Sequence, residues 1–187
     1  MDSLMNNDSG STVADLHTKR YYRNHGGFLW VDRHGIDHRA DTLLTYLQKV
    51  DEMGFKTKHF YVNQITQDLE RLHSLNLGEG NEDINHVMAR LEYRLTKSYL
   101  RYVGGQRFGF VNPSFVLNRL DSIAPNPYDS IKRAVRYRGL FDVKMQHASD
   151  AFFHLALQQL RSKVDVDGEE TEKSRLAAFL KDVQPKS

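Results

Sequence analysis

Cysteine is absent from all 187 residues of this chain. Its absence excludes disulfide bonds, cysteine-ligated zinc sites and a cysteine nucleophile within the chain. The same absence does not decide the cellular compartment, because cysteine-free domains occur both in the cytoplasm and in the periplasm.

Long apolar runs are absent as well. No stretch approaches the roughly 20 apolar residues of a transmembrane helix. Residues 1–10 are polar and lack the apolar core of a signal peptide. If the parent protein is exported, we expect that its signal or anchor has been removed, that Met1 is an artificial start and that residues 1–11 form a flexible leader.

An excess of charge of one sign is also missing. The chain has 26 Lys and Arg against 24 Asp and Glu, a formal net charge of +2, and its pI is near 8.7. A dedicated nucleic-acid binder would carry a dense basic stripe, so only a weak attraction to anionic polymers is expected. Ten Phe, nine Tyr and one Trp supply the large side chains of a core.

Apolar residues recur at helical spacing along most of the chain. Helices are predicted from a Ser11 cap through Val13, Leu16 and Tyr21 to Gly26, and at 38–53, 63–75, 82–103, 113–120, 128–138, 142–161 and 169–183. The predicted fold class is all-α, a compact domain of about six to eight helices. A short extended segment, 28–31, should pack Trp30 into the core, and a turn is expected at 32–35.

Glycines and prolines mark the expected boundaries. Gly54 should end the helix at 38–53, and Gly104 with Gly105 should end the helix at 82–103, leaving 106–112 as a loop. In that long helix Glu92, Arg94, Lys97 and Arg101 lie off the apolar stripe. Three regions follow: a leader at 1–11, a helical domain at 12–124, and a helical extension at 125–187 that packs on the same domain.

An ordered series of short segments runs from Tyr21 to Pro113. The segments are Tyr21-Tyr22-Arg23-Asn24, Phe28-Leu29-Trp30-Val31, Arg39 to Leu47, Met53-Gly54-Phe55, Leu91 to Thr96, Tyr99 to Tyr102, Gly109 and Val111-Asn112-Pro113. Their order and spacing resemble the scaffold domain that precedes the catalytic domain in large bacterial L,D-transpeptidases, the enzymes that cross-link peptidoglycan.

This resemblance implies a non-catalytic role. Such a domain would support and orient the cysteine catalytic domain of the same parent chain, help to hold peptidoglycan, and lie in the periplasm or cell envelope. The parent would be an acyltransferase that needs a thiolate nucleophile. No Gly-Cys pair exists here, and His34-Gly35 is followed by Ile36, which indicates a turn. We therefore expect a truncated chain from which the catalytic domain is missing.

Other chemistry finds little support in the residue pattern. No Gly-x-Ser-x-Gly elbow is present. Gly35 separates His34 from His38, which disfavours a chelating helical pair, and His17 and His25 belong to no zincin motif. The acidic run at 165–170 lacks the ligand spacing of a calcium loop. No catalytic, cofactor or metal site is predicted.

One basic segment remains as a candidate contact surface. Its four cations, Lys132, Arg133, Arg136 and Arg138, lie within seven residues and would suit an anionic polymer. The simpler interpretation is a solvated helix face whose Arg stems cover apolar surface. An alternative function is a stand-alone helical module that uses residues 132–138 to bind a protein or nucleic acid.

Overall fold

The fold is mainly helical, with a two-stranded hairpin near its start. The computed structural model describes residues 1–10, 12–32, 34–74, 83–109, 150–161 and 168–184. The elements are α1 (Asp2–Asn6), α2 (Val13–Arg23), β1 (Val31–Asp32), β2 (Gly35–Ile36), α3 (Arg39–Leu47), the 3-10 helices η1 (Val50–Met53) and η2 (Thr57–Phe60), α4 (Val62–His73), α5 (Ile84–Phe108), a helical segment at 150–161 and α8 (Gly168–Asp182). The predicted all-α fold class is confirmed.

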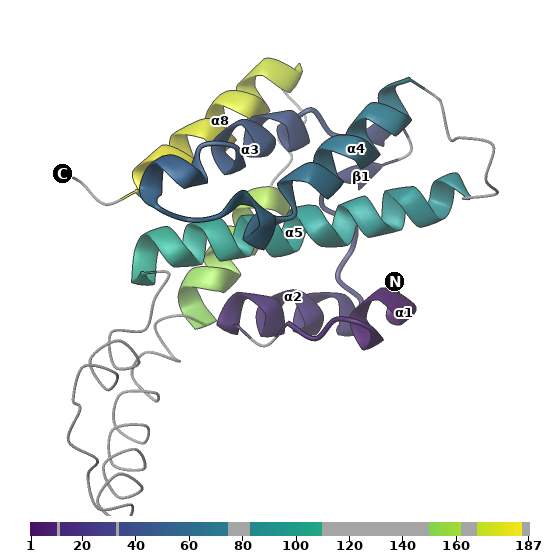
Figure 1. The fold of residues 1–187 in the computed structure, drawn as a ribbon, viewed down its shortest axis with the longest axis horizontal. Coiled ribbons are helices and arrows are strands. Elements are labelled where there is room, and N and C mark those ends of the chain that lie inside the picture. Colours follow the sequence, from purple (N-terminus) through teal and green to yellow (C-terminus); the bar gives the residue numbers. More distant parts are fainter. Residues whose placement is uncertain (11, 33, 75–82, 110–149, 162–167, 185–187) are drawn as a thin grey trace, which may run out of the picture.

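Helix α5 is the centre of the arrangement. It lies between α2 on one side and α3 and α4 on the other, and α8 packs on α3 (Figure 1). Because neighbours cover it on more than one face, its polar residues Glu92 and Thr96 are as deeply buried as Leu95. The charged residues that lie off the apolar stripe therefore do not form a solvated face.

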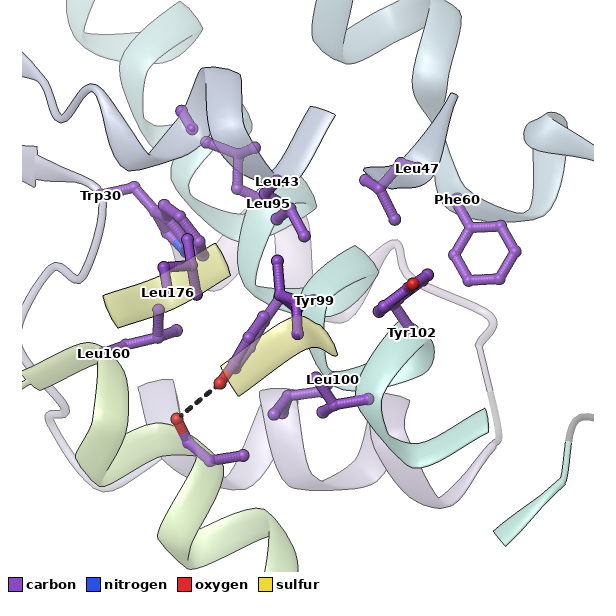
Figure 2. Close-up of a cluster of buried hydrophobic side chains, with 14 of the residues drawn as sticks. Trp30, Leu43, Leu47, Phe60, Leu95, Tyr99, Leu100, Tyr102, Leu160 and Leu176 are labelled. Carbon is purple, nitrogen blue, oxygen red and sulfur yellow. Dashed lines mark hydrogen bonds between the residues drawn. The ribbon is translucent and has the colours of Figure 1, made fainter. Parts of the chain in front are cut away.

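The core joins the two ends of the sequence. Trp30 and Tyr99 are fully buried in it, together with side chains from α3, the segment 150–161 and α8. Figure 2 shows the Tyr99 ring among these side chains, with its hydroxyl donating to the carbonyl of Ala156 at 3.1 Å. The predicted burial of Trp30 is confirmed, and this core holds helices far apart in the sequence together.

A tight hairpin follows Trp30. Val31 pairs with Ile36, and Asp32 pairs with Gly35. Gly35 adopts φ +119°, a conformation that suits glycine, and the Asp32 carboxylate accepts the backbone N–H of His34 at 2.7 Å. The turn predicted at 32–35 is confirmed as this hairpin.

Helix α2 begins one residue later than predicted. Thr12 is its N-cap and exchanges hydrogen bonds with Asp15 in a capping box, so the prediction of a Ser11 cap is wrong. The expected apolar positions Val13 and Leu16 are 51% and 52% exposed. The face turned to α5 is instead largely polar, because α5 supplies partners for Asp15 and Tyr22.

Two predicted helix boundaries are corrected. The helix expected at 38–53 ends at Leu47, and the separate η1 ends at Met53 with Gly54 as its C-cap at φ +83°. Helix α5 passes through Gly104 and continues to Phe108, so 106–108 are not loop. A Cβ on Gly104 would lie 2.6 Å from the Phe153 ring, so glycine here permits close helix packing rather than ending the helix.

The N-terminal segment is more ordered than predicted, and several predicted helices lie outside the described residues. Residues 1–10 contain α1 and buried Met5, where the sequence predicts a flexible leader. The predicted helices at 113–120 and 128–138, the boundary near 125 and the start of the helix at 142–161 lie outside the described residues. In the described part of that helix Leu155 is exposed, while Phe153 and Leu160 enter the core.

Candidate functional site

A carboxylate on α5 organises the loop that carries Trp30. Glu92 Oε1 accepts the N–H of Leu29 at 2.7 Å, and Oε2 accepts the N–H groups of Trp30 at 2.8 Å and Val31 at 3.1 Å. The Tyr22 hydroxyl donates to Oε1 at 2.6 Å. Four donors from α2 and the 29–31 loop therefore converge on one side chain.

A chain of hydroxyl groups extends this junction. The Trp30 indole N–H donates to Thr96 Oγ1 at 3.0 Å, and the Thr96 hydroxyl lies 2.7 Å from the Tyr22 oxygen. Since the Tyr22 proton is directed to Glu92, Thr96 must donate to Tyr22. Each hydroxyl is thus both donor and acceptor, and we call Tyr22, Trp30, Glu92 and Thr96 the Glu92 junction.

The Glu92 junction is not accessible to a substrate. Burial raises the pKa of Glu92, and the four hydrogen bonds only partly offset it. Burial and the nearby Glu92 charge also raise the pKa of Tyr22 far above its usual value, so Tyr22 stays protonated. A general base must reach a substrate proton, yet Glu92 and Thr96 are fully buried and their oxygens are already paired. The junction instead holds α2 and residues 29–31 against α5.

A second carboxylate group ties the N-terminal segment to α5. Asp8 accepts from Lys97 Nζ at 2.6 Å, from the Tyr93 hydroxyl at 2.8 Å and from the Gly10 N–H at 2.9 Å. Burial alone would raise the pKa of Asp8, but these bonds outweigh it and lower the value to about 2. Asp8 is therefore ionised at any physiological pH.

Asp15 on α2 is held in the same region. Arg101 forms a two-pronged contact with it, Nε to Oδ1 at 2.7 Å and Nη2 to Oδ2 at 2.9 Å. Arg101 also donates to the His59 carbonyl, and its guanidinium lies 5.3 Å from the Tyr61 ring centre. This contact joins α2, α5 and the η2 region.

Asp68 on α4 forms a third group. Its carboxylate accepts Arg90 Nε at 3.0 Å and Nη2 at 2.6 Å, and Arg94 Nη1 at 3.0 Å. Arg39, on α3, is likewise buried and donates to the carbonyls of Leu29 and Leu160. In each case a charged side chain links two or three elements.

The histidines weighed, and not chosen, as metal ligands in the sequence lie in different parts of the fold. His34 is in the hairpin turn, and His38 precedes α3. His17 is buried on α2, where its Nε2 lies 2.8 Å from Asp150, while His25 follows α2 with φ +56°. Among the residues that the structure describes, no group of three His, Asp or Glu is placed to hold a metal ion.

The candidate anionic-polymer residues Lys132, Arg133, Arg136 and Arg138 lie outside the described residues. Of the junction residues, the sequence predicts burial for Trp30 but not for Glu92 and Thr96. One signal was available: positions 92, 96, 99 and 103 follow helical spacing, and Tyr99 and Val103 are core residues. A second buried stripe on α5, containing Glu92 and Thr96, could have been inferred from it.

A comparison with protein families identifies the family of this chain. The sequence matches the family model described as "Scaffold domain" over residues 16–139. The chain belongs to this Scaffold domain family. No curated protein matches the chain, and no solved structure does.

The Scaffold domain match covers the Glu92 junction completely. It also includes Lys97 and Arg101, but it begins after Asp8 and Asp15. Within the described helices of this Scaffold domain, none is both long enough and apolar enough to cross a membrane.

Proposed function

We propose that this chain is the non-catalytic scaffold domain of an L,D-transpeptidase-like enzyme that cross-links peptidoglycan. The match to the Scaffold domain family over residues 16–139 carries the proposal. The ordered segments from Tyr21 to Pro113, which resemble the scaffold of those transpeptidases, support the finer assignment. The partner is the cognate cysteine catalytic domain, and the location is the periplasm or cell envelope.

The chemistry of the described residues is compatible with a supporting role. The chain has no cysteine to supply a thiolate. Its buried carboxylates, Glu92, Asp15 and Asp68, are all bonded to groups of the same chain. Fully satisfied buried networks favour one rigid arrangement, and a rigid body is what orienting a neighbouring domain requires.

The first experiment is to determine the size of the native protein in its source cell with an antibody raised against this chain. A species much heavier than 21.7 kDa in the envelope fraction, with a cysteine in the additional part, is expected. A native species near 21.7 kDa in the cytosol would refute the proposal. The basic segment at 132–138 would then be tested as an interaction surface by charge reversal of Arg133, Arg136 and Arg138.

A second experiment tests the supporting role in the parent enzyme. The chain alone should yield no cross-linked peptide dimer from purified stem peptides. In the full-length enzyme, Glu92→Gln should lower cross-linking, because it loosens the scaffold. The matched variant Glu70→Gln, at an exposed position of α4, should leave cross-linking unchanged. Any cross-linking by the isolated chain would contradict a non-catalytic role.

A further inference from the structure

The N-terminal segment packs against aromatic side chains of two helices. Met5 is 4% exposed and forms a small cluster with Tyr22 of α2 and Tyr93 of α5, separate from the main core. Met1 and Leu4 pack on the same cluster. α1, which carries Met5, is five residues long and has no side-chain cap. Such a short helix is not stable by itself, so its conformation depends on packing in this cluster.

Three residues after Met5, a carboxylate enters a basic site. Asp8 Oδ1 is bonded to Lys97, and Oδ2 is bonded to Tyr93 and lies 3.9 Å from Lys19 Nζ. Lys97 is 2% exposed with Asp8 in place. Its other carboxylate, Asp15, is 3.8 Å away and already holds Arg101 in a two-pronged contact. Without Asp8, Asp15 would be the one carboxylate within 4.0 Å of Lys97 Nζ among the residues that the structure describes.

The backbone of the segment is hydrogen-bonded by a side chain of α2, as the backbone of a bound peptide would be. Lys19 Nζ donates to the carbonyl of Asp8 at 2.7 Å and to that of Gly10 at 2.8 Å. Gly10 itself fits closely, since a Cβ there would lie 2.6 Å from both Asp15 Oδ2 and Lys97 Nζ. Side chains and main chain of the segment are therefore both recognised by α2 and α5.

The two parts of this contact differ in their relation to the family. Tyr22, Tyr93, Lys19 and Lys97 fall within the Scaffold domain match, which begins at residue 16. Residues 1–10, which pack on the Met5 cluster and enter the basic site, fall before it. The match thus includes these four contact residues of α2 and α5 but not the segment that contacts them.

We infer that α2 and α5 form a docking groove for an acidic peptide segment, which residues 1–10 of this chain occupy in cis. The groove takes an apolar side chain against the adjacent rings of Tyr22 and Tyr93 and a carboxylate, three residues further on, at Lys97, Lys19 and the Tyr93 hydroxyl. The natural ligand is a peptide of another chain with this apolar–acidic pattern, and residues 1–10 compete with it. The inference does not depend on the enzyme to which the domain belongs.

The test uses the full chain and a fluorescent decapeptide that copies residues 1–10. Asp8→Lys places a cation against Lys97 and should release the segment from its groove. The decapeptide should then bind the Asp8→Lys protein, with a change in anisotropy. Wild type should bind it at least about tenfold more weakly, because an attached competitor acts at an effective concentration in the millimolar range.

Controls separate the groove from general charge effects. Asp2→Lys makes the same charge change at an exposed position of the same segment, and it should bind the decapeptide no better than wild type. A decapeptide carrying Asp8→Asn should bind the Asp8→Lys protein about tenfold more weakly than the unmodified peptide, since it lacks the charge-assisted bonds. Equal binding of the two peptides would overturn the carboxylate site.

Two further results decide the matter if Asp8→Lys does not fold. Gly10→Ala, which should displace the segment by steric contact, is then titrated in its place, and failure of a folded variant to bind the decapeptide overturns the inference. Hydrogen exchange of unmodified wild type gives an independent answer. Amides of residues 2–10 should exchange much faster than those of α5. Protection equal to that of α5 would make the segment a permanent part of the fold and would overturn its role as a competitor.

Discussion

Replacing Glu92 by glutamine tests whether the Glu92 junction holds the fold together. Each carboxylate oxygen accepts two hydrogen bonds: Oε1 from Leu29 and Tyr22, and Oε2 from Trp30 and Val31. Glutamine keeps one oxygen and presents an amino group where the other stood. Whichever way the amide is oriented, two donors lose their acceptor.

The cost follows from the burial of those donors. Leu29, Trp30 and Tyr22 are buried, and an unsatisfied buried donor costs about 1–3 kcal/mol. Glu92→Gln should therefore lower the free energy of unfolding by about 4 kcal/mol, the middle of the range for two donors. For a domain of this size, that corresponds to a fall in Tm of about 8–16 °C. Total stabilities are about 5–15 kcal/mol, so the variant should fold but only marginally.

The assay is urea unfolding followed by tryptophan fluorescence. Trp30 is the single tryptophan of the chain, is fully buried and donates both its N–H groups to the junction. Its emission should shift to longer wavelength at a lower urea concentration in the variant. Glu70→Gln, the same exchange at an exposed position, should change stability by less than about 0.5 kcal/mol. A loss below about 1 kcal/mol for Glu92→Gln would refute the reasoning.

Two further predictions concern other contacts on α5. Asp8→Asn should destabilise the fold at neutral pH. The pKa of Asp8 falls from 3.8 to about 2 on folding. The difference in stability between wild type and Asp8→Asn should therefore be largest above pH 4 and should vanish as the pH is lowered towards 2. Urea midpoints across that range measure it, and a difference that stays constant with pH would contradict the prediction. Gly104→Ala should lower stability by up to about 2 kcal/mol, since the new Cβ meets the Phe153 ring. Helix propensity alone would give a gain of about 1 kcal/mol, so the sign of the change in urea midpoint decides.

Helical periodicity made much of the fold predictable. The positions of α4 and α5 follow from apolar spacing, and Trp30 was placed in the core because a short apolar run bounded by glycines cannot form a helix. These features depend on local sequence alone. Local sequence also suggested Gly104 as a helix end, but the reason for that glycine is the Phe153 ring, from a distant segment.

The polar core could not be predicted in the same way. A charged residue such as Glu92 reads as solvent-facing unless its partners are known, and these lie about sixty to seventy positions away in the sequence. Likewise, α2 turns Asp15 inward and Val13 outward because Arg101 satisfies the carboxylate. A charged side chain can be buried when residues distant in the sequence pair with it, and the spacing of apolar residues carries no information about such partners.

The packing of α8 on α3 has a consequence for the synthesis of this protein. The Tyr46 hydroxyl of α3 donates to the carbonyl of Ala177 in α8, 131 residues later in the chain. At about 5–20 residues per second, a ribosome needs about 7–26 s to make the intervening polypeptide. During that interval the inner face of α3, with Leu43 and Leu47, is not yet covered by α8. We therefore expect chaperones that bind exposed apolar helices to act on the nascent domain, because its core cannot close before α8 has left the ribosome.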